Sequence, residues 1–138
     1  MAWSKEAAVK YAEENAESGS TGKCAKYVKN ALVQGGLTYL GCVHARNCGG
    51  GLEAQGFAMV MDQATDIGVY EVGDVVVIEG WADPDGEEGP KKGNASGHLA
   101  LWNGKVWISD FVQTKSVYPG PGYRENKPAY KIYRNAVQ

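Results

Sequence analysis

The order of hydrophobic patterns along the chain most narrows its possible folds. Residues 4–17 and about 22–34 carry apolar side chains at helical spacing, and a pair of glycines at 35–36 ends the second segment. From residue 57 onward, apolar residues occur instead in short runs typical of strands, such as residues 75–78 (VVVI). Because helices come first and strands joined by tight turns follow, the sequence predicts an α+β fold.

Shorter segments complete this prediction. We expect a short helix at 51–55, a strand at 57–60 and a last strand at 129–133, with a long polar loop between 80 and 97. Residues 98–102 and 105–111 are expected to pair as a hairpin around Asn103-Gly104. The sequence has neither repeats nor a linker, so its 138 residues (14.8 kDa) are predicted to form one domain, 1–138.

Charge and hydropathy exclude several classes of function. The chain has 14 basic and 16 acidic residues without a basic stripe, which argues against a dedicated nucleic-acid binder. No apolar run approaches the roughly 18 residues of a membrane span. The N-terminus lacks the charged and then apolar pattern of a signal peptide, so we expect the protein to be made in the cytoplasm without one.

The three cysteines divide into a close pair and a separate thiol. Cys42 and Cys48 lie in one Gly-rich segment, and their pairing would indicate an oxidising compartment. Three reduced thiols in a cytosolic protein remain the alternative. A zinc site built from Cys42, His44 and Cys48 lacks a fourth ligand unless Cys24 supplies it.

Cys24 is the strongest candidate for chemistry. With Ser20 or Thr21 as the N-cap, it falls within about one turn of the start of the second helix. The positive end of the helix dipole and the neighbouring Lys23 would favour the thiolate and make the thiol reactive. The alternative is a small buried side chain in the core.

His98 is the better placed of the two histidines to act as a base. It follows a glycine and opens a predicted strand, whereas His44 lies in an irregular loop and is expected at the surface. A three-residue hairpin loop would place Asp110 opposite His98, and a two-residue loop would place Ser109 there. In the first register, Cys24, His98 and Asp110 would be the nucleophile, the base and the group that orients it.

Three segments now resemble a known family. Residues 24–28 (CAKYV) resemble the start of the catalytic helix in CHAP domains, which are related to the NlpC/P60 cysteine amidases. Residues 72–77 (VGDVVV) are similar to the Gly-Asp strand of those families, with Val72 at the usual proline. Residues 96–101 (SGHLAL) are similar to their histidine strand, and the order of the three segments also agrees.

The resemblance implies a papain-like fold in which N-terminal helices pack on an antiparallel β-sheet. It carries over Cys24 as the nucleophile and His98 as the base, and Asp110 is our choice for the variable third position. It implies hydrolysis of an amide bond in the peptide stem or cross-link of peptidoglycan, without a metal or organic cofactor.

The small single domain is similar to the amidase effectors delivered by type VI secretion, with a phage endolysin CHAP domain as the close alternative. We therefore expect a secreted antibacterial toxin that acts as a monomer in the periplasm of a target bacterium, where Cys42 and Cys48 would form a disulfide. A cognate immunity protein is the expected partner. A non-catalytic wall-binding module and a thiol protease or transglutaminase are the competing functions.

Overall fold

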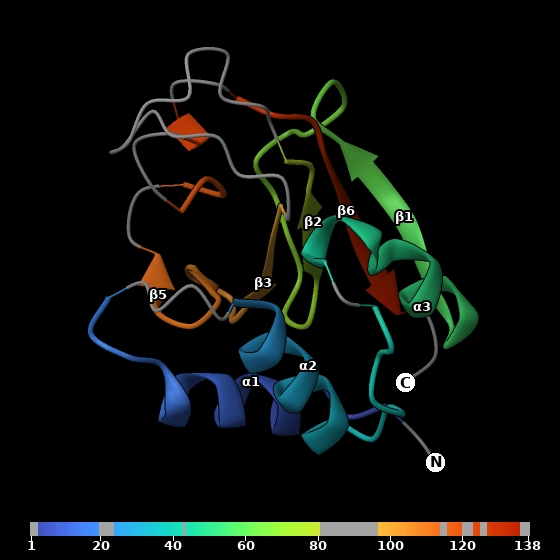
Figure 1. Ribbon diagram of the computed structural model, residues 1–138, viewed down its shortest axis with the longest axis vertical. Helices are drawn as coiled ribbons and strands as arrows, with labels where there is room; N and C mark the ends of the chain where they lie inside the picture. Colours follow the sequence, from blue (N-terminus) through green and yellow to red (C-terminus); the bar gives the residue numbers. More distant parts are fainter. Residues whose placement is uncertain are drawn as a thin grey trace.

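The computed structural model describes residues 3–19, 24–42, 44–80, 97–113, 116–119, 123–124 and 127–135. These ranges contain helices in the first half of the chain and then strands, which confirms the α+β prediction (Figure 1). The elements are α1 (Lys5–Asn15), α2 (Cys24–Gln34), η1 (Ala45–Asn47), α3 (Gly49–Ala54), β1 (Phe57–Asp62), β2 (Val75–Ile78), β3 (His98–Trp102), β4 (Trp107–Ile108), β5 (Val112–Gln113) and β6 (Tyr130–Asn135).

The strands form one antiparallel sheet with the order β1-β6-β2-β3-β4-β5. The C-terminal strand β6 therefore lies between β1 and β2, two strands from the middle of the chain. All four residues of β2 are buried because β2 has a neighbour on each side and a hydrophobic cluster on each face. This double burial explains why the run carries no alternating polar residues.

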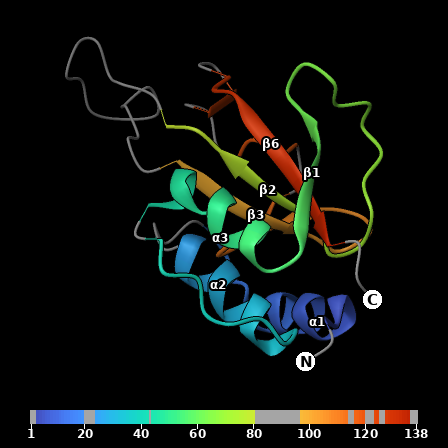
Figure 2. The same ribbon diagram turned by 90° about the vertical axis from the view of Figure 1, so that its right-hand side faces the viewer.

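The helices cover one face of the sheet (Figures 1 and 2). Val28 and Leu32 of α2 pack there with Leu99 and Leu101 of β3, and all four side chains are fully buried. The opposite face carries a second cluster that is rich in aromatic residues. It includes Trp107, Tyr123, Tyr130 and Ile132. The two faces thus differ in cover and in composition.

The Gly-Asp turn before β2 joins three elements. Gly73 has φ +92°, and a Cβ there would lie 2.7 Å from the Cβ of Lys5 in α1. Asp74 is fully buried and accepts hydrogen bonds of 2.8 Å from both Nε and Nη2 of Arg134 in β6. The motif therefore holds α1, β2 and β6 together.

The predicted hairpin forms, but with neither predicted register. The structure pairs Leu101 with Ile108 and Trp102 with Trp107, which centres the turn on Gly104-Lys105 rather than on Asn103-Gly104. The side chain of Asn103 causes this shift, because its Oδ1 accepts from the backbone N–H groups of Lys105 and Val106, each at 2.8 Å.

Other element boundaries differ by a few residues. The first and third helices were expected at 4–17 and 51–55 and occupy Lys5–Asn15 and Gly49–Ala54. The second arm of the hairpin was expected to run to residue 111, but β4 already ends at Ile108. The long polar loop, 81–96, lies outside the described residues, as do the expected N-caps of α2.

Candidate active site

Cys24 is the first residue of α2 and lies half-buried beside β3. Its thiol hydrogen-bonds with the backbone of Leu99, the residue next to His98. Burial raises the pKa of the Cys24 thiol above its ordinary value, the Leu99 bond lowers it in part, and the charge of Asp110 raises it further. The sequence left open whether the helix start would favour the thiolate or burial would oppose it, and burial has the larger effect on the pKa of this thiol.

His98 opens β3 and is buried, with its Nε2 atom 2.8 Å from Oε1 of Gln113 in β5. The amide nitrogen of Gln113 donates to the carbonyl oxygens of Ser116 (3.1 Å) and Val117 (3.0 Å). Because both amide hydrogens are used in this way, the amide oxygen faces the imidazole and must accept from it. His98 therefore carries its proton on Nε2, and the lone pair lies on Nδ1.

The imidazole of His98 is neutral at neutral pH. Burial lowers its pKa to about 4, although the hydrogen bond to Gln113 and the charge of Asp110 act in the opposite direction. With the pKa of the Cys24 thiol raised, both the thiol and the imidazole are neutral in the resting state. A neutral imidazole is the form that accepts a proton.

Asp110 is fully buried next to these two residues. Its Oδ1 accepts from the hydroxyl of Ser109 at 3.1 Å, and its backbone carbonyl accepts from the N–H of Glu17 at 2.7 Å. Its charge shifts the pKa of both Cys24 and His98. Neither of the two cross-strand partners that the sequence left open for His98, Asp110 or Ser109, pairs with it, because β4 ends at Ile108.

Gln113 is the functional candidate that the sequence analysis missed. It lies 15 residues from His98 in the chain and comes from a strand of two residues. A lone glutamine in a polar segment carries no sequence signal, because its partner is set by the path of the chain between β4 and β5. The aromatic ring of Tyr123 completes the surroundings of His98, at 5.7 Å between ring centroids.

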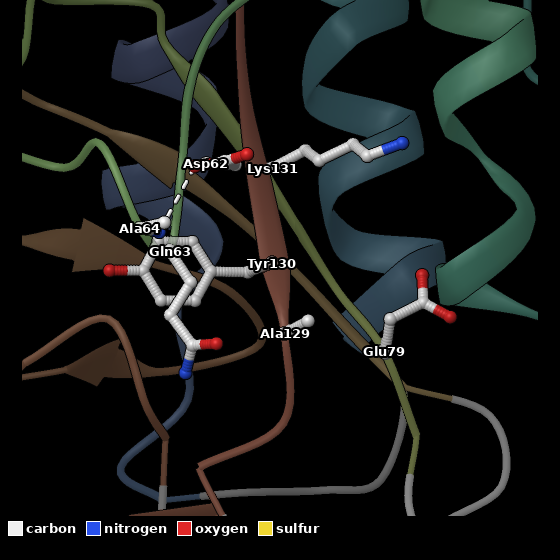
Figure 3. Close-up of a pocket in the computed structure, with 7 residues that line it drawn as sticks. All are labelled: Asp62, Gln63, Ala64, Glu79, Ala129, Tyr130 and Lys131. Carbon is white, nitrogen blue, oxygen red and sulfur yellow. Dashed lines mark hydrogen bonds between the residues drawn. The ribbon is translucent and has the colours of Figure 1, made fainter.

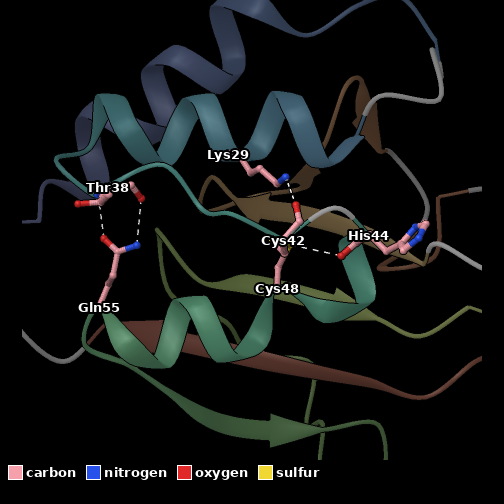
Figure 4. The surroundings of a disulfide bond; sticks show 6 residues. All are labelled: Lys29, Thr38, Cys42, His44, Cys48 and Gln55. Atoms are coloured by element: carbon pink, nitrogen blue, oxygen red, sulfur yellow. Dashed lines mark hydrogen bonds between the residues drawn. A yellow bond between two sulfur atoms is a disulfide. The ribbon is translucent and has the colours of Figure 1, made fainter.

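Cys42 and Cys48 form a disulfide, which decides between the two alternatives that the sequence left open for these cysteines (Figure 4). It removes both thiols from any zinc site, and the described residues contain no group of three or more His, Cys, Asp or Glu side chains that could hold a metal ion. The ammonium of Lys29 in α2 donates to the carbonyl of Cys42, and His44 is exposed, as predicted (Figure 4).

The disulfide-closed loop lies against the strand that begins with His98. A Cβ on Gly97 would lie 2.9 Å from the Cβ of Arg46 in η1 and 2.2 Å from the carbonyl oxygen of Ile78. Gly97 also has φ +75°, so a side chain would be strained there for two reasons. The loop therefore supports the residue that immediately precedes the imidazole.

A hollow of about 470 Å³ lies at the ends of β1, β6 and β2 (Figure 3). Its walls include Asp62, Glu79, Tyr130 and Lys131, and none of the three predicted catalytic residues lines it. The carboxylate of Asp62 accepts from the backbone N–H groups of Ala64 and Thr65, each at 3.0 Å, and so holds the turn after β1. This hollow is separate from the Cys24–His98 site.

In the part of the chain that the structure describes, every helix is too short or too polar to cross a membrane.

Comparisons with known proteins identify the class of this chain. Neither protein-family models nor curated proteins give a significant match. The solved structures that match include two of the type VI effector-immunity complex Tae3-Tai3 from Ralstonia pickettii. The native complex matches with 36% identity over 96% of this chain and 99% of that chain, at a TM-score of 0.77. The selenomethionine complex matches with 39% identity over 92% and 98%, at a TM-score of 0.75.

These matches extend over nearly the whole of both chains and define a type VI effector. Within that class, the chain belongs to the Tae3 family.

Proposed function

We propose that this protein is a cysteine amidase that hydrolyses an amide bond in the peptide part of peptidoglycan, with a papain-like NlpC/P60 fold. One observation carries the proposal. The helix-start thiol of Cys24 bonds to the backbone beside His98, whose tautomer is set by Gln113 so that Nδ1 carries the lone pair. A thiol, an imidazole acceptor and a fixed amide are the parts of a nucleophile, a base and an orienting group.

In the proposed reaction, Nδ1 of His98 takes the thiol proton as the sulfur of Cys24 attacks the scissile carbonyl. In this scheme the backbone N–H of Cys24, at the start of α2, donates to the developing oxyanion. The imidazolium then gives its proton to the leaving amine, which leaves a thioester on Cys24. Water, deprotonated by His98, attacks the thioester and releases the acyl group as a carboxylic acid. The imidazolium then returns the proton to the sulfur of Cys24.

Two further residues act on His98 in this scheme. The charge of Asp110 favours the imidazolium that forms during the reaction, since it raises the pKa of His98. Gln113 keeps the ring in the tautomer that the first proton transfer needs. Asp110 thus remains our proposed third catalytic residue, and Gln113 is a positioning residue.

The proposed site of action is the periplasm of a target bacterium, reached by type VI secretion. The match to a type VI effector favours this route over an endolysin, and the disulfide fits an oxidising compartment. Because the matched structures are effector-immunity complexes, a cognate immunity protein is the proposed partner.

The test is digestion of purified sacculi, followed by mass spectrometry of the released fragments, which also identifies the bond that is cut. We expect Cys24→Ala to release no fragments, and His98→Gln to be strongly impaired. His44→Gln is the matched control, because it makes the same change at an exposed histidine and should retain activity. Undiminished digestion by folded Cys24→Ala would refute the proposal, and binding to sacculi without cleavage by the wild type would favour a wall-binding module.

A further inference from the structure

An aromatic pocket on the sheet face opposite the helices shares Gln113 with the chemistry described above. It has a volume of about 430 Å³, within the usual range for ligand sites of about 300–1,000 Å³. Half of its lining residues are aromatic, and one residue of the candidate active site also lines it. The residues that matter here are Tyr70, Trp102, Trp107, Gln113, Tyr118 and Tyr130.

The rings of this pocket are held in fixed positions. Tyr70 contacts Trp102 and Trp107 with centroids 4.8 Å and 4.9 Å apart, and the two tryptophans lie 5.2 Å apart at a steep angle. The hydroxyls of Tyr70 and Tyr130 both donate to Oδ2 of Asp66, at 2.8 Å and 2.6 Å. The walls are therefore organised before any ligand binds, which lowers the entropic cost of binding.

The exposure of these rings matches a ligand that has both apolar faces and polar edges. Trp107 and Tyr130 are buried, but Tyr70, Trp102 and Tyr118 are only partly buried and so keep accessible surface. Aromatic surface alone would suit a hydrocarbon, but the pocket is also lined by the ammonium-bearing residue Lys105. A pyranose ring presents C–H groups on its faces and hydroxyl or acetamido groups at its edges, and so it fits this mixture.

The pocket adjoins the candidate active site through one side chain. Gln113 lines the pocket and also accepts the hydrogen bond from Nε2 of His98. A ligand in the pocket therefore lies one residue away from the imidazole. Peptidoglycan joins a sugar directly to the peptide, so one substrate molecule would reach both the aromatic pocket and the candidate active site.

We propose that this pocket binds an N-acetylated hexosamine of the glycan strand, and that the enzyme therefore prefers stem peptides that are still attached to sugar. This inference rests on the proposed function, because it names a second part of the same substrate.

Binding is tested with the full chain carrying Cys24→Ala, using chitotetraose as a glycan without peptide and a synthetic stem peptide without sugar. The readout is the indole N–H resonances in NMR titrations. Chitotetraose should shift the signals of Trp102 and Trp107 but not that of Trp3, which lies in the helix-side core. Unchanged Trp102 and Trp107 signals at millimolar chitotetraose, or shifts caused by the free peptide instead, would overturn the proposal.

A variant series tests the same pocket through activity. We expect Trp102→Leu to lower kcat/KM for a sugar-linked stem peptide about tenfold more than for the free peptide, equivalent to about 1.4 kcal/mol. Trp102→Phe, which keeps an aromatic face, should retain most of the kcat/KM for the sugar-linked peptide that Trp102→Leu loses. Tyr39→Leu is the control, because Tyr39 is an exposed aromatic residue outside the pocket. Equal losses on both substrates would refute a glycan site.

The two proposals fail separately. Cleavage of sugar-free and sugar-linked peptides at equal rates, without chitotetraose binding, would refute the glycan pocket and support the amidase. Chitotetraose binding by a wild-type protein that cleaves no peptide would refute the amidase and support the pocket.

Discussion

The disulfide between Cys42 and Cys48 makes a quantitative prediction about stability and activity. It closes a short loop, with a sequence separation of 6, and Lys29 of α2 donates to the carbonyl of Cys42. Reduction releases the loop without removing any side chain from the core. The direct perturbation is therefore reduction of the wild type, compared with the double variant Cys42→Ala/Cys48→Ala.

The magnitude follows from the length of the closed loop. The chain-entropy relation for a loop of this size gives about 2.2 kcal/mol of stabilisation at 25 °C. A chain of this length has an unfolding entropy of about 0.29 kcal/mol/K near its Tm, so the Tm should fall by about 8 °C on reduction. A domain of ordinary stability, about 5–15 kcal/mol, would remain folded at 25 °C after this loss.

Activity should nevertheless fall at 25 °C, because η1 within this loop lies against Gly97, directly before His98. The assay pairs thermal unfolding by circular dichroism with initial rates on sacculi, each with and without a non-thiol reductant. The reductant should change neither quantity in the double variant, which controls for effects on Cys24.

A decrease in Tm of less than about 2 °C on complete reduction would refute the entropic argument. A full decrease in Tm with an unchanged rate would refute the link between the loop and His98. A decrease in both the Tm and the rate on reduction would indicate that activity depends on an oxidising compartment.

Two further predictions concern His98. Gln113→Ala should lower kcat by about tenfold or more with little change in KM, because the imidazole loses the acceptor that sets its tautomer. Gln113→Asn should recover little activity, since its shorter amide does not reach the imidazole. Equal activity of the wild type and both variants would refute the positioning role. The acid limb of kcat/KM should have its midpoint near pH 4 rather than near the ordinary 6.5, because only neutral His98 takes the proton, and a midpoint at 6–7 would contradict the effect of burial. The same lowered pKa means that the unfolded chain binds this proton more readily, so stability should fall by about 3 kcal/mol between pH 6.5 and about 4, which urea titrations at each pH would measure.

The elements could be predicted well where local sequence decides them. The run VVVI at 75–78 became β2 with the predicted boundaries, because a β-branched run between turn signals has few alternatives. The second helix ended at Gln34, before Gly35 and Gly36, as predicted. The hairpin register failed because one Asn103 side chain, through two hydrogen bonds, moved the turn by one residue.

The site was less predictable, because its contacts join distant parts of the chain. Cys24 and His98 could be selected from a helix start and a strand start, but the burial that raises one pKa and lowers the other depends on packing over the whole domain. Gln113 could not be selected, because no local sequence pattern indicates that its side chain contacts His98. Asp110 was chosen for a variable third position, and one of the two open hairpin registers would have paired it with His98. That register does not form, but the charge of Asp110 does shift the pKa of both Cys24 and His98.

The early end of β4 explains how a thiol from the helical layer reaches the strand that carries His98. The N–H of Trp102 donates towards β2, to the carbonyl of Asp74 at 2.8 Å, so the backbone of Leu99, three residues earlier, points towards the β4 side. If the observed register continued, Asp110 would pair with Leu99 and cover this backbone.

Instead the chain leaves the sheet after Ile108, and the carbonyl of Asp110 accepts from the N–H of Glu17. The backbone of Leu99 can therefore hydrogen-bond with the thiol of Cys24. Extension of β4 by two residues would close the site, so the short strand is a requirement of the site rather than an irregularity of the sheet.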